Sequence, residues 1–246
     1  MAQRPSPSMM ARRVHEYGPP EVMRFERIPR PDPGPGVVLV KVEAVGVGPW
    51  DGWIRTGKSA LPQPLPLTLG SDLAGKVIAA GPVVSRLRVG DNIYGVTNHQ
   101  FVGAYAEHAL ASAAMVASKP TTLSYTEAAS VPVVAVTAQQ ALFDHAQLKA
   151  GRTVLIHGAA GSVGAFAIQL ARRAGLPTIA TAARDDSPPT RRCARGSLHA
   201  GRRAPSSERK DRARRRSQLS RLCEPSTRQR RLSEHDMQGK RGKPGY

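Results

Sequence analysis

The chain has 246 residues, with 36 Lys and Arg against 18 Asp and Glu, and a formal net charge of +18. Both cysteines, Cys193 and Cys223, lie in the last quarter, which excludes a disulfide framework and a thiolate metal site in residues 1–186. No apolar run reaches the ~18 residues that a membrane-spanning helix needs, which excludes a membrane span.

The first residues, MAQRPSPSMMARRVHEYG, are rich in charged and polar side chains and contain no apolar central segment. A secretory signal requires such a segment. We therefore expect a disordered leader over residues 1–11 and a cytoplasmic protein.

Residues 12–123 show the pattern of a small β-rich domain. The stretch GVVLVKVEAVGVG, residues 36–48, is β-branched and apolar and follows the Pro- and Gly-rich PRPDPGPG, which predicts a strand. Over residues 69–96, short apolar runs are separated by Gly and Pro at close intervals, as in strands joined by tight turns. The pattern ends at Pro120.

Helical spacing begins near residue 124. Ser124 or Thr126 is a suitable N-cap with Glu127 in the first turn, and apolar residues recur at helical spacing until Gly151. A strand (TVLIHG), a glycine-rich turn, a helix and a second strand (PTIATAA) follow. Residues 124–186 therefore predict a helix and then one βαβ unit, the start of a doubly wound nucleotide-binding domain.

The glycine-rich turn is GAAGSVG, residues 158–164. Compared with the dinucleotide-binding pattern G-x-G-x-x-G, it has Ala159 in place of the first glycine. Gly161 allows the backbone to approach a pyrophosphate, Gly164 allows close packing of helix on strand, and Gly158 is placed to form the tight turn. The first amides of the helix would then face the phosphates. The expected cofactor-binding residues of the turn are Gly158, Ala160, Gly161, Ser162, Val163 and Gly164. The alternative is a purely structural turn between strand and helix.

The end of the second strand bears on the choice of nucleotide. An NAD site has an acidic residue there, whereas an NADP site has a basic group for the 2′-phosphate. Arg184 directly follows TIATAA, which predicts NADP(H) as the cofactor. The alternative is that Arg184 is a solvated loop residue.

Five stretches of the chain occur in the order typical of one family: residues 18–57, 65–81, 87–96, 103–109 and 154–175. Together they resemble the medium-chain dehydrogenase/reductase superfamily and, within it, the zinc-independent quinone oxidoreductase branch. The resemblance covers residues 12–184. It implies an α/β plus β-rich fold class, with a GroES-like catalytic domain followed by an incomplete Rossmann domain. It also implies NADPH-dependent reduction of a quinone or another electron-poor enone or carbonyl substrate, and homo-oligomeric intact relatives.

Zinc-dependent members of the superfamily carry a Cys after the early strand and a His-Glu pair after a later Leu-Gly. The corresponding stretches here read GVGPWDG and LGSDLAG, with Ser71 and Asp72 in place of His-Glu. Zinc needs a set of N and S ligands that these residues do not supply. We therefore expect no metal, and direct transfer of a hydride from the nicotinamide to the substrate.

The resemblance also implies site residues, although it assigns no catalytic side chain. Asp51 and Trp53 match positions that border the substrate pocket, and Thr137 matches a position near the nicotinamide. Gly48 and Trp53 stand where relatives commonly carry Asn and Tyr. The alternatives are a packing role for Trp53 and a core-helix role for Thr137.

Residues 187–246 differ in composition from the rest of the chain. They contain no Val, Ile, Phe or Trp and only four Leu. From Arg184 onward the chain carries 19 Lys and Arg against 7 Asp and Glu, a net charge of +12. This composition predicts a disordered basic tail. Our hypothesis for its origin is a frameshift near residues 185–190, which would leave an inactive fragment of such an enzyme. The other alternative is nucleic-acid binding through the tail.

Overall fold

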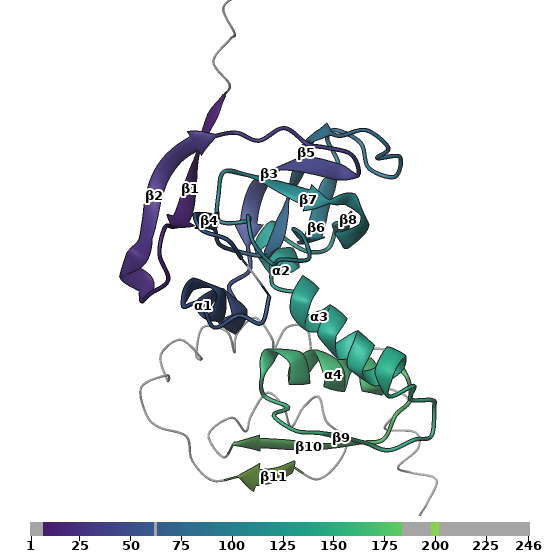
Figure 1. Cartoon of the computed structure of the whole chain (residues 1–246). Coiled ribbons are helices and arrows are strands. Elements are labelled where there is room, and N and C mark those ends of the chain that lie inside the picture. The colour runs from purple at the N-terminus through teal and green to yellow at the C-terminus, as the bar shows by residue number, and fades with distance from the viewer. Residues whose placement is uncertain (1–6, 62, 184–197, 202–246) are drawn as a thin grey trace, which may run out of the picture. The chain divides into compact units, whose positions relative to one another are not determined.

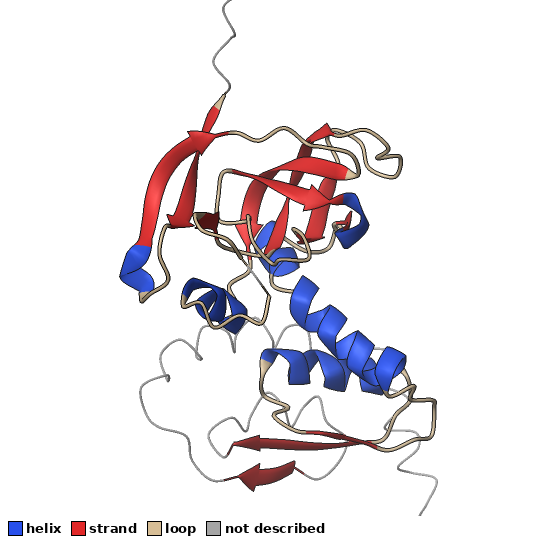
Figure 2. Ribbon diagram, viewed as in Figure 1, coloured by secondary structure: helices blue, strands red, loops and turns tan. Residues whose placement is uncertain are grey.

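The computed structural model describes residues 7–61, 63–183 and 198–201 (Figure 1). The chain divides into two compact units, Met1–Val136 and Thr137–Tyr246. The first unit is built mainly of strands and the second alternates strands with a helix (Figure 2). The α/β plus β-rich fold class predicted from the sequence is confirmed.

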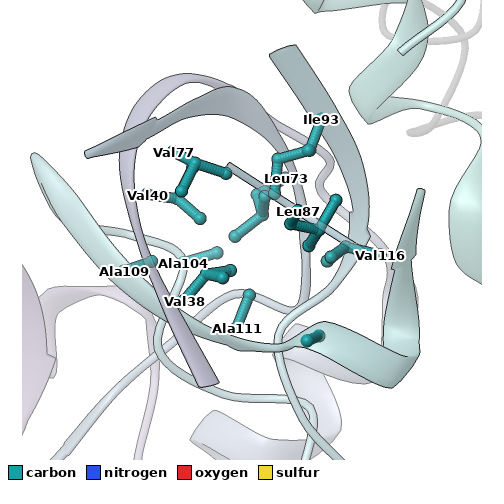
Figure 3. Close-up of a cluster of buried hydrophobic side chains, with 11 residues drawn as sticks. Val38, Val40, Leu73, Val77, Leu87, Ile93, Ala104, Ala109, Ala111 and Val116 are labelled. Carbon is teal, nitrogen blue, oxygen red and sulfur yellow. The ribbon is translucent and has the colours of Figure 1, made fainter. Parts of the chain in front are cut away.

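The first unit contains a five-stranded sheet of order β7-β3-β5-β6-β8, in which every neighbouring pair is antiparallel. Its strands are β3 (Val37–Val45), β5 (Asp72–Ala80), β6 (Asn92–Val96), β7 (His108–Ser112) and β8 (Val116–Ser118). Alternate residues of these strands point inward and form one buried apolar cluster, as Figure 3 shows for Val38, Val40, Leu73, Val77 and Ile93. The predicted strand over residues 36–48 is thus β3, which lies inside this sheet between β7 and β5.

A smaller sheet in the same unit has the order β2-β1-β4, with β1 (Ser8–Val14), β2 (Met23–Pro29) and β4 (Leu67–Thr68). The disordered leader expected over residues 1–11 is corrected here, because residues 8–11 belong to β1. Met9 and Ala11 alternate inward and are buried, while β1 pairs with β2 along its whole length. Residues 1–6 lie outside the described residues.

Helical segments lie between and after these strands, and the last of them belongs to the second unit. They are α1 (Pro49–Arg55), α2 (Tyr125–Ala129), α3 (Pro132–Gln139) and the π-helical η3 (Gln140–His145), with short 3-10 turns η1 (Pro20–Val22) and η2 (Ala113–Met115). Ser124 caps α2 as expected. Its hydroxyl accepts the backbone N–H of Glu127, and the Glu127 carboxylate accepts the backbone N–H of Ser124.

The single helix expected from residue 124 onward is interrupted before Pro132. Proline lacks an amide hydrogen and its ring clashes with the preceding turn, so α2 ends at Ala129 and α3 begins at Pro132. The division between the two units falls within α3.

The second unit contains the predicted βαβ arrangement. Strands β9 (Val154–Ile156) and β10 (Thr178–Ala183) are parallel and are connected by α4 (Ser162–Arg173). Ile156 and Ala180 of the strands and Ile168 and Ala171 of the helix belong to one buried cluster. Gly175, at φ +72, follows the end of α4, which is the usual place for a glycine with positive φ.

A further strand, β11 (Leu198–Gly201), lies parallel to β10, giving the order β11-β10-β9. The sequence predicted no regular structure after residue 186, so the prediction of disorder is corrected for these four residues. Backbone pairing with the exposed edge of β10 needs no apolar periodicity in the added segment. Residues 184–197 and 202–246, with Arg184, the frameshift hypothesis and the nucleic-acid alternative, lie outside the described residues.

Candidate functional site

In the first unit, a group of hydrogen-bonded polar side chains surrounds α1. Asp51 is only 5% exposed. Its Oδ2 accepts the backbone N–H of Gly48 at 2.8 Å and the hydroxyl of Tyr105 at 3.1 Å. Asp51 therefore caps the first turn of α1 through the Gly48 amide, and it connects that turn to Tyr105 in the segment before β7.

The electrostatics of this pair follow from burial. Burial raises the pKa of Asp51, while the Gly48 amide and the Tyr105 hydroxyl act in the opposite direction. Burial, together with the nearby Asp51 charge, raises the pKa of Tyr105. The second oxygen of Asp51, Oδ1, is buried without a partner in hydrogen-bond geometry. Asp51 and Tyr105 thus form a polar contact whose proton-donating group is the phenol.

Trp53 lies on the same helix but in a different environment. It is 57% exposed, whereas Asp51 is buried. Residues two positions apart on a helix do not share a face. The structure therefore separates the two residues expected to border the substrate pocket, and it leaves Trp53 as the one presented to solvent.

A second polar network connects α1, β5 and α3. The indole Nε1 of Trp50 donates to Ser71 Oγ at 2.8 Å, and the Ser71 hydroxyl donates to Asp72 Oδ2 at 2.8 Å. The backbone N–H of Val133 donates to Asp72 Oδ1 at 2.8 Å. Ser71 and Asp72 are both buried. Both oxygens of Asp72 therefore accept hydrogen bonds inside the fold.

Asp72 is the most strongly perturbed carboxyl group of this region. Burial raises its pKa to about 6, against the lowering effects of the Val133 amide and the Ser71 hydroxyl. The Asp51 charge raises it further by a smaller amount. Sequence reasoning compared Ser71 and Asp72 only with zinc ligands and assigned them no role. The available signal was a charged residue at the start of the apolar strand LAGKVIAA.

Thr137 lies in α3 and is exposed. This argues against the alternative of a threonine packed in the helix core. It lies four residues, about one helical turn, beyond Val133, whose amide is held by Asp72.

The glycine turn of the second unit has the backbone geometry that the sequence suggested. Gly158 adopts φ +65, a left-handed conformation that favours glycine. A Cβ at Gly164 would lie 2.4 Å from the Gly158 carbonyl oxygen, so only glycine permits this approach of α4 to the turn. Ala159 is fully buried in the cluster around α4, and its N–H donates to Thr181 O at 2.8 Å. An alanine fits the first glycine position because Gly158 makes the turn.

The turn leads into the N-terminus of α4. Gly161 is the N-cap residue, in extended conformation, and α4 runs for 12 residues from Ser162. Gly161, Ser162 and Val163 are exposed and Ala160 is half-buried. A Cβ at Gly161 would approach the Gly158 oxygen to 3.2 Å and meet no other atom within 4 Å, so the space outside the turn is open. Exposed first amides of a helix of this length suit a phosphate group.

The described residues offer neither a metal site nor a membrane-spanning helix. No group of three or more His, Cys, Asp or Glu side chains is placed to hold a metal ion. No helix in this part of the chain is long and apolar enough to cross a membrane.

Comparisons with known proteins agree with both units. Residues 34–121 match the alcohol dehydrogenase GroES-like domain. Human quinone oxidoreductase is 40% identical over 179 residues, which cover 72% of this chain and 54% of the human protein. A quinone oxidoreductase from Pseudomonas aeruginosa is 38% identical over 175 residues, covering 70% of this chain and 53% of the relative. The chain thus spans about half the length of the curated relatives it matches.

Solved structures show the same similarity. The quinone oxidoreductase from Coxiella burnetii has a TM-score of 0.72 at 34% identity, covering 78% of this chain and 62% of its own. A mycobacterial protein solved in complex with NADPH has a TM-score of 0.69 at 33% identity, covering 80% of this chain and 59% of its own. The family resemblance predicted from five sequence stretches is confirmed.

Proposed function

Since the chain belongs to the quinone oxidoreductase-like branch of the medium-chain dehydrogenase/reductase superfamily, we propose that it binds NADP(H) and serves hydride transfer to a quinone or another electron-poor enone or carbonyl compound. The observation that carries this proposal is the glycine turn, in which Gly158, Gly161 and Gly164 combine positive φ, open space and close helix packing. The similarity to an NADPH-bound mycobacterial structure supports the choice of cofactor.

Each residue of the turn has a distinct role in this proposal. The amides of Ser162 and Val163 hold the pyrophosphate with the positive end of the α4 dipole. Gly161 and Ala160 leave the backbone open to its oxygens, and Gly164 keeps α4 close to the turn. Arg184 neutralises the 2′-phosphate and so selects NADP(H) over NAD(H).

On the substrate side, the chain provides position and electrostatics rather than a metal ligand set. When bound, the cofactor would supply the hydride, and water would supply the proton to the substrate oxygen. Thr137 orients the nicotinamide, Trp53 offers an exposed aromatic surface to a planar substrate, and Asp51 holds α1 in place. Ser71 and Asp72, at the positions of a zinc-binding pair in relatives, are both engaged in hydrogen bonds within the fold.

The test separates binding from turnover. NADPH fluorescence is titrated with the purified 246-residue chain, and quinone-dependent oxidation of NADPH is then followed by absorbance. We expect saturable binding of NADPH and oxidation that depends on the quinone. Absence of binding refutes the proposal. Binding without oxidation supports the second candidate, a chain that binds the nucleotide without catalysing the transfer.

A further inference from the structure

Helix α3 begins without an N-cap side chain of its own. Val131, which precedes the helix, has no side-chain oxygen, and Pro132 at the first position has no amide hydrogen. The first helical residue with an N–H to donate is therefore Val133. Its amide donates to Asp72 Oδ1 at 2.8 Å, across 61 residues of sequence. A carboxylate oxygen on this N–H is the contact that a local N-cap residue normally makes.

We infer that Asp72 is a positioning residue that caps α3 from strand β5 and so holds the helix that carries Thr137. Its effect on NADP(H) binding, through Thr137, rests on the proposed function. Its effect on α3 does not.

The surroundings of Asp72 are specific for a carboxylate. Trp50 Nε1 donates to Ser71 Oγ, which leaves the Ser71 hydroxyl hydrogen to donate to Asp72 Oδ2. A protonated Oδ2 would compete with this hydrogen for the same position. Space is also restricted, because a Cβ at Gly46 would lie 2.8 Å from Asp72 Cβ and 2.5 Å from the Ala129 carbonyl oxygen. The two donors hold the carboxylate with Oδ2 toward the Ser71 hydroxyl and Oδ1 toward the Val133 amide of α3.

The charges around Asp72 are few. Asp51 of α1 acts on its titration, and Asp72 in turn acts on that of Tyr105. The register partner of Asp72 on β6 is the uncharged Val96. The N-terminus of α3 contributes the positive end of the helix dipole, which stabilises a negative charge at this point. Within the described part of the chain, no Lys or Arg side chain contributes to the pKa shift of Asp72.

Hydrogen–deuterium exchange of peptides covering residues 131–139 measures the cap directly in the full chain. In Asp72→Ala, loss of the cap should speed exchange at the start of α3 by roughly five- to tenfold. Asp72→Asn keeps an oxygen at Oδ1 and should stay within about threefold of the wild type. The control is Asp91→Ala, because Asp91 Oδ2 accepts the Arg88 amide at 2.8 Å in a turn away from α3. It should leave residues 131–139 unchanged.

The affinity for NADPH should change in parallel with the exchange rates of these variants. Its Kd should rise in Asp72→Ala, return toward the wild-type value in Asp72→Asn, and stay unchanged in Asp91→Ala. Unaltered exchange at residues 131–139 in Asp72→Ala overturns the inference. If the wild-type chain does not bind NADPH, the proposed function fails, and the exchange data alone decide the role of Asp72.

An NMR titration of the wild-type chain tests the inference even if Asp72→Ala does not fold. In this titration, the Val133 amide should shift with the same midpoint as the Asp72 carboxyl carbon, because the Val133 N–H donates its hydrogen bond to the Asp72 carboxylate. The Asp51 carboxyl and the Tyr105 ring are followed in the same experiment to identify their contributions. A Val133 amide that does not respond to the titration of Asp72 overturns the inference.

Discussion

Asp72 Oδ1, at the start of β5, accepts a 2.8 Å hydrogen bond from the backbone amide of Val133 in α3. The contact joins a strand of the five-stranded sheet to the first turn of a helix 61 positions later in the chain. It requires a buried carboxylate, and burial disfavours the charged form of such a group. Burial of Asp72, which outweighs the opposing effect of the Val133 amide on its pKa, therefore makes stability depend on pH.

We predict that the free energy of unfolding falls as the pH rises from 4 to 8. Burial raises the pKa of Asp72 from an ordinary 3.8 to about 6, so the folded state takes up a proton more readily than the unfolded state. The stabilisation is complete below the unfolded pKa and is lost as the pH passes through the folded value. The loss amounts to roughly 3 kcal/mol. Denaturant unfolding at a series of pH values measures it.

Asp72→Asn tests the assignment of this slope. The variant should be much less sensitive to pH over the same interval. The remaining slope is due to Asp51, whose pKa burial also raises, and to His108, whose pKa burial lowers and which acts in the opposite direction. A variant with the full wild-type slope would show that another group is responsible.

Gly164→Ala should destabilise the second unit. The new Cβ would lie 2.4 Å from the Gly158 oxygen and 2.7 Å from Ala159 Cα, and both are backbone atoms that cannot rotate away. Overpacking of this kind costs about 1–3 kcal/mol. Thermal unfolding should show a lower Tm, and NADPH titration should show a higher Kd.

The matched control for that change is Gly34→Ala, where a Cβ meets nothing within 4 Å. It should leave both Tm and Kd near the wild-type values. Equal effects of the two substitutions would mean that the close approach of α4 to the turn at Gly164 is not the cause of the destabilisation.

Tyr105→Phe should weaken the first unit more at neutral than at acidic pH. The substitution keeps the ring but removes the hydroxyl that donates to Asp51 Oδ2 at 3.1 Å. A hydrogen bond to a charged group contributes about 1.5–3 kcal/mol, and protonation of Asp51 reduces that contribution. Tyr94→Phe on β6 serves as the control. A loss of stability that is the same at every pH would contradict a bond to the ionised carboxylate.

Arg184→Ala should reduce the preference for NADP(H). Loss of one charged partner of the 2′-phosphate should raise the Kd for NADPH by about tenfold or more. The Kd for NADH should not change, because NADH lacks this phosphate. Arg173→Ala, at the last turn of α4, removes the same charge from an exposed position. If Arg173→Ala weakens NADPH binding as much as Arg184→Ala does, the effect arises from net charge rather than from a specific contact.

Local patterns were sufficient to predict much of this fold. The β-branched stretch over residues 36–48 and the capping sequence at Ser124 determine β3 and the start of α2, because alternation and capping act between neighbours in sequence. Gly158 was identified as the residue of the tight turn for the same reason. Five stretches of the chain in the order typical of one family, of which this turn is the last, indicated the family, which the comparisons confirm.

Only the tertiary structure decided the environment of the polar residues. Asp51 and Trp53 are two residues apart, yet one is buried against Gly48 and Tyr105 and the other is exposed. The strand at residues 8–11 forms because β2 supplies a partner for it. Asp72 caps α3 because the fold brings β5 to the start of that helix. Alternation, helical spacing and capping are set by neighbouring residues, so the sequence by itself determined β3, the start of α2 and the order of strand, turn and helix around Gly158. Burial and hydrogen-bond partners depend on residues that are far apart along the chain, so the fold alone could assign them.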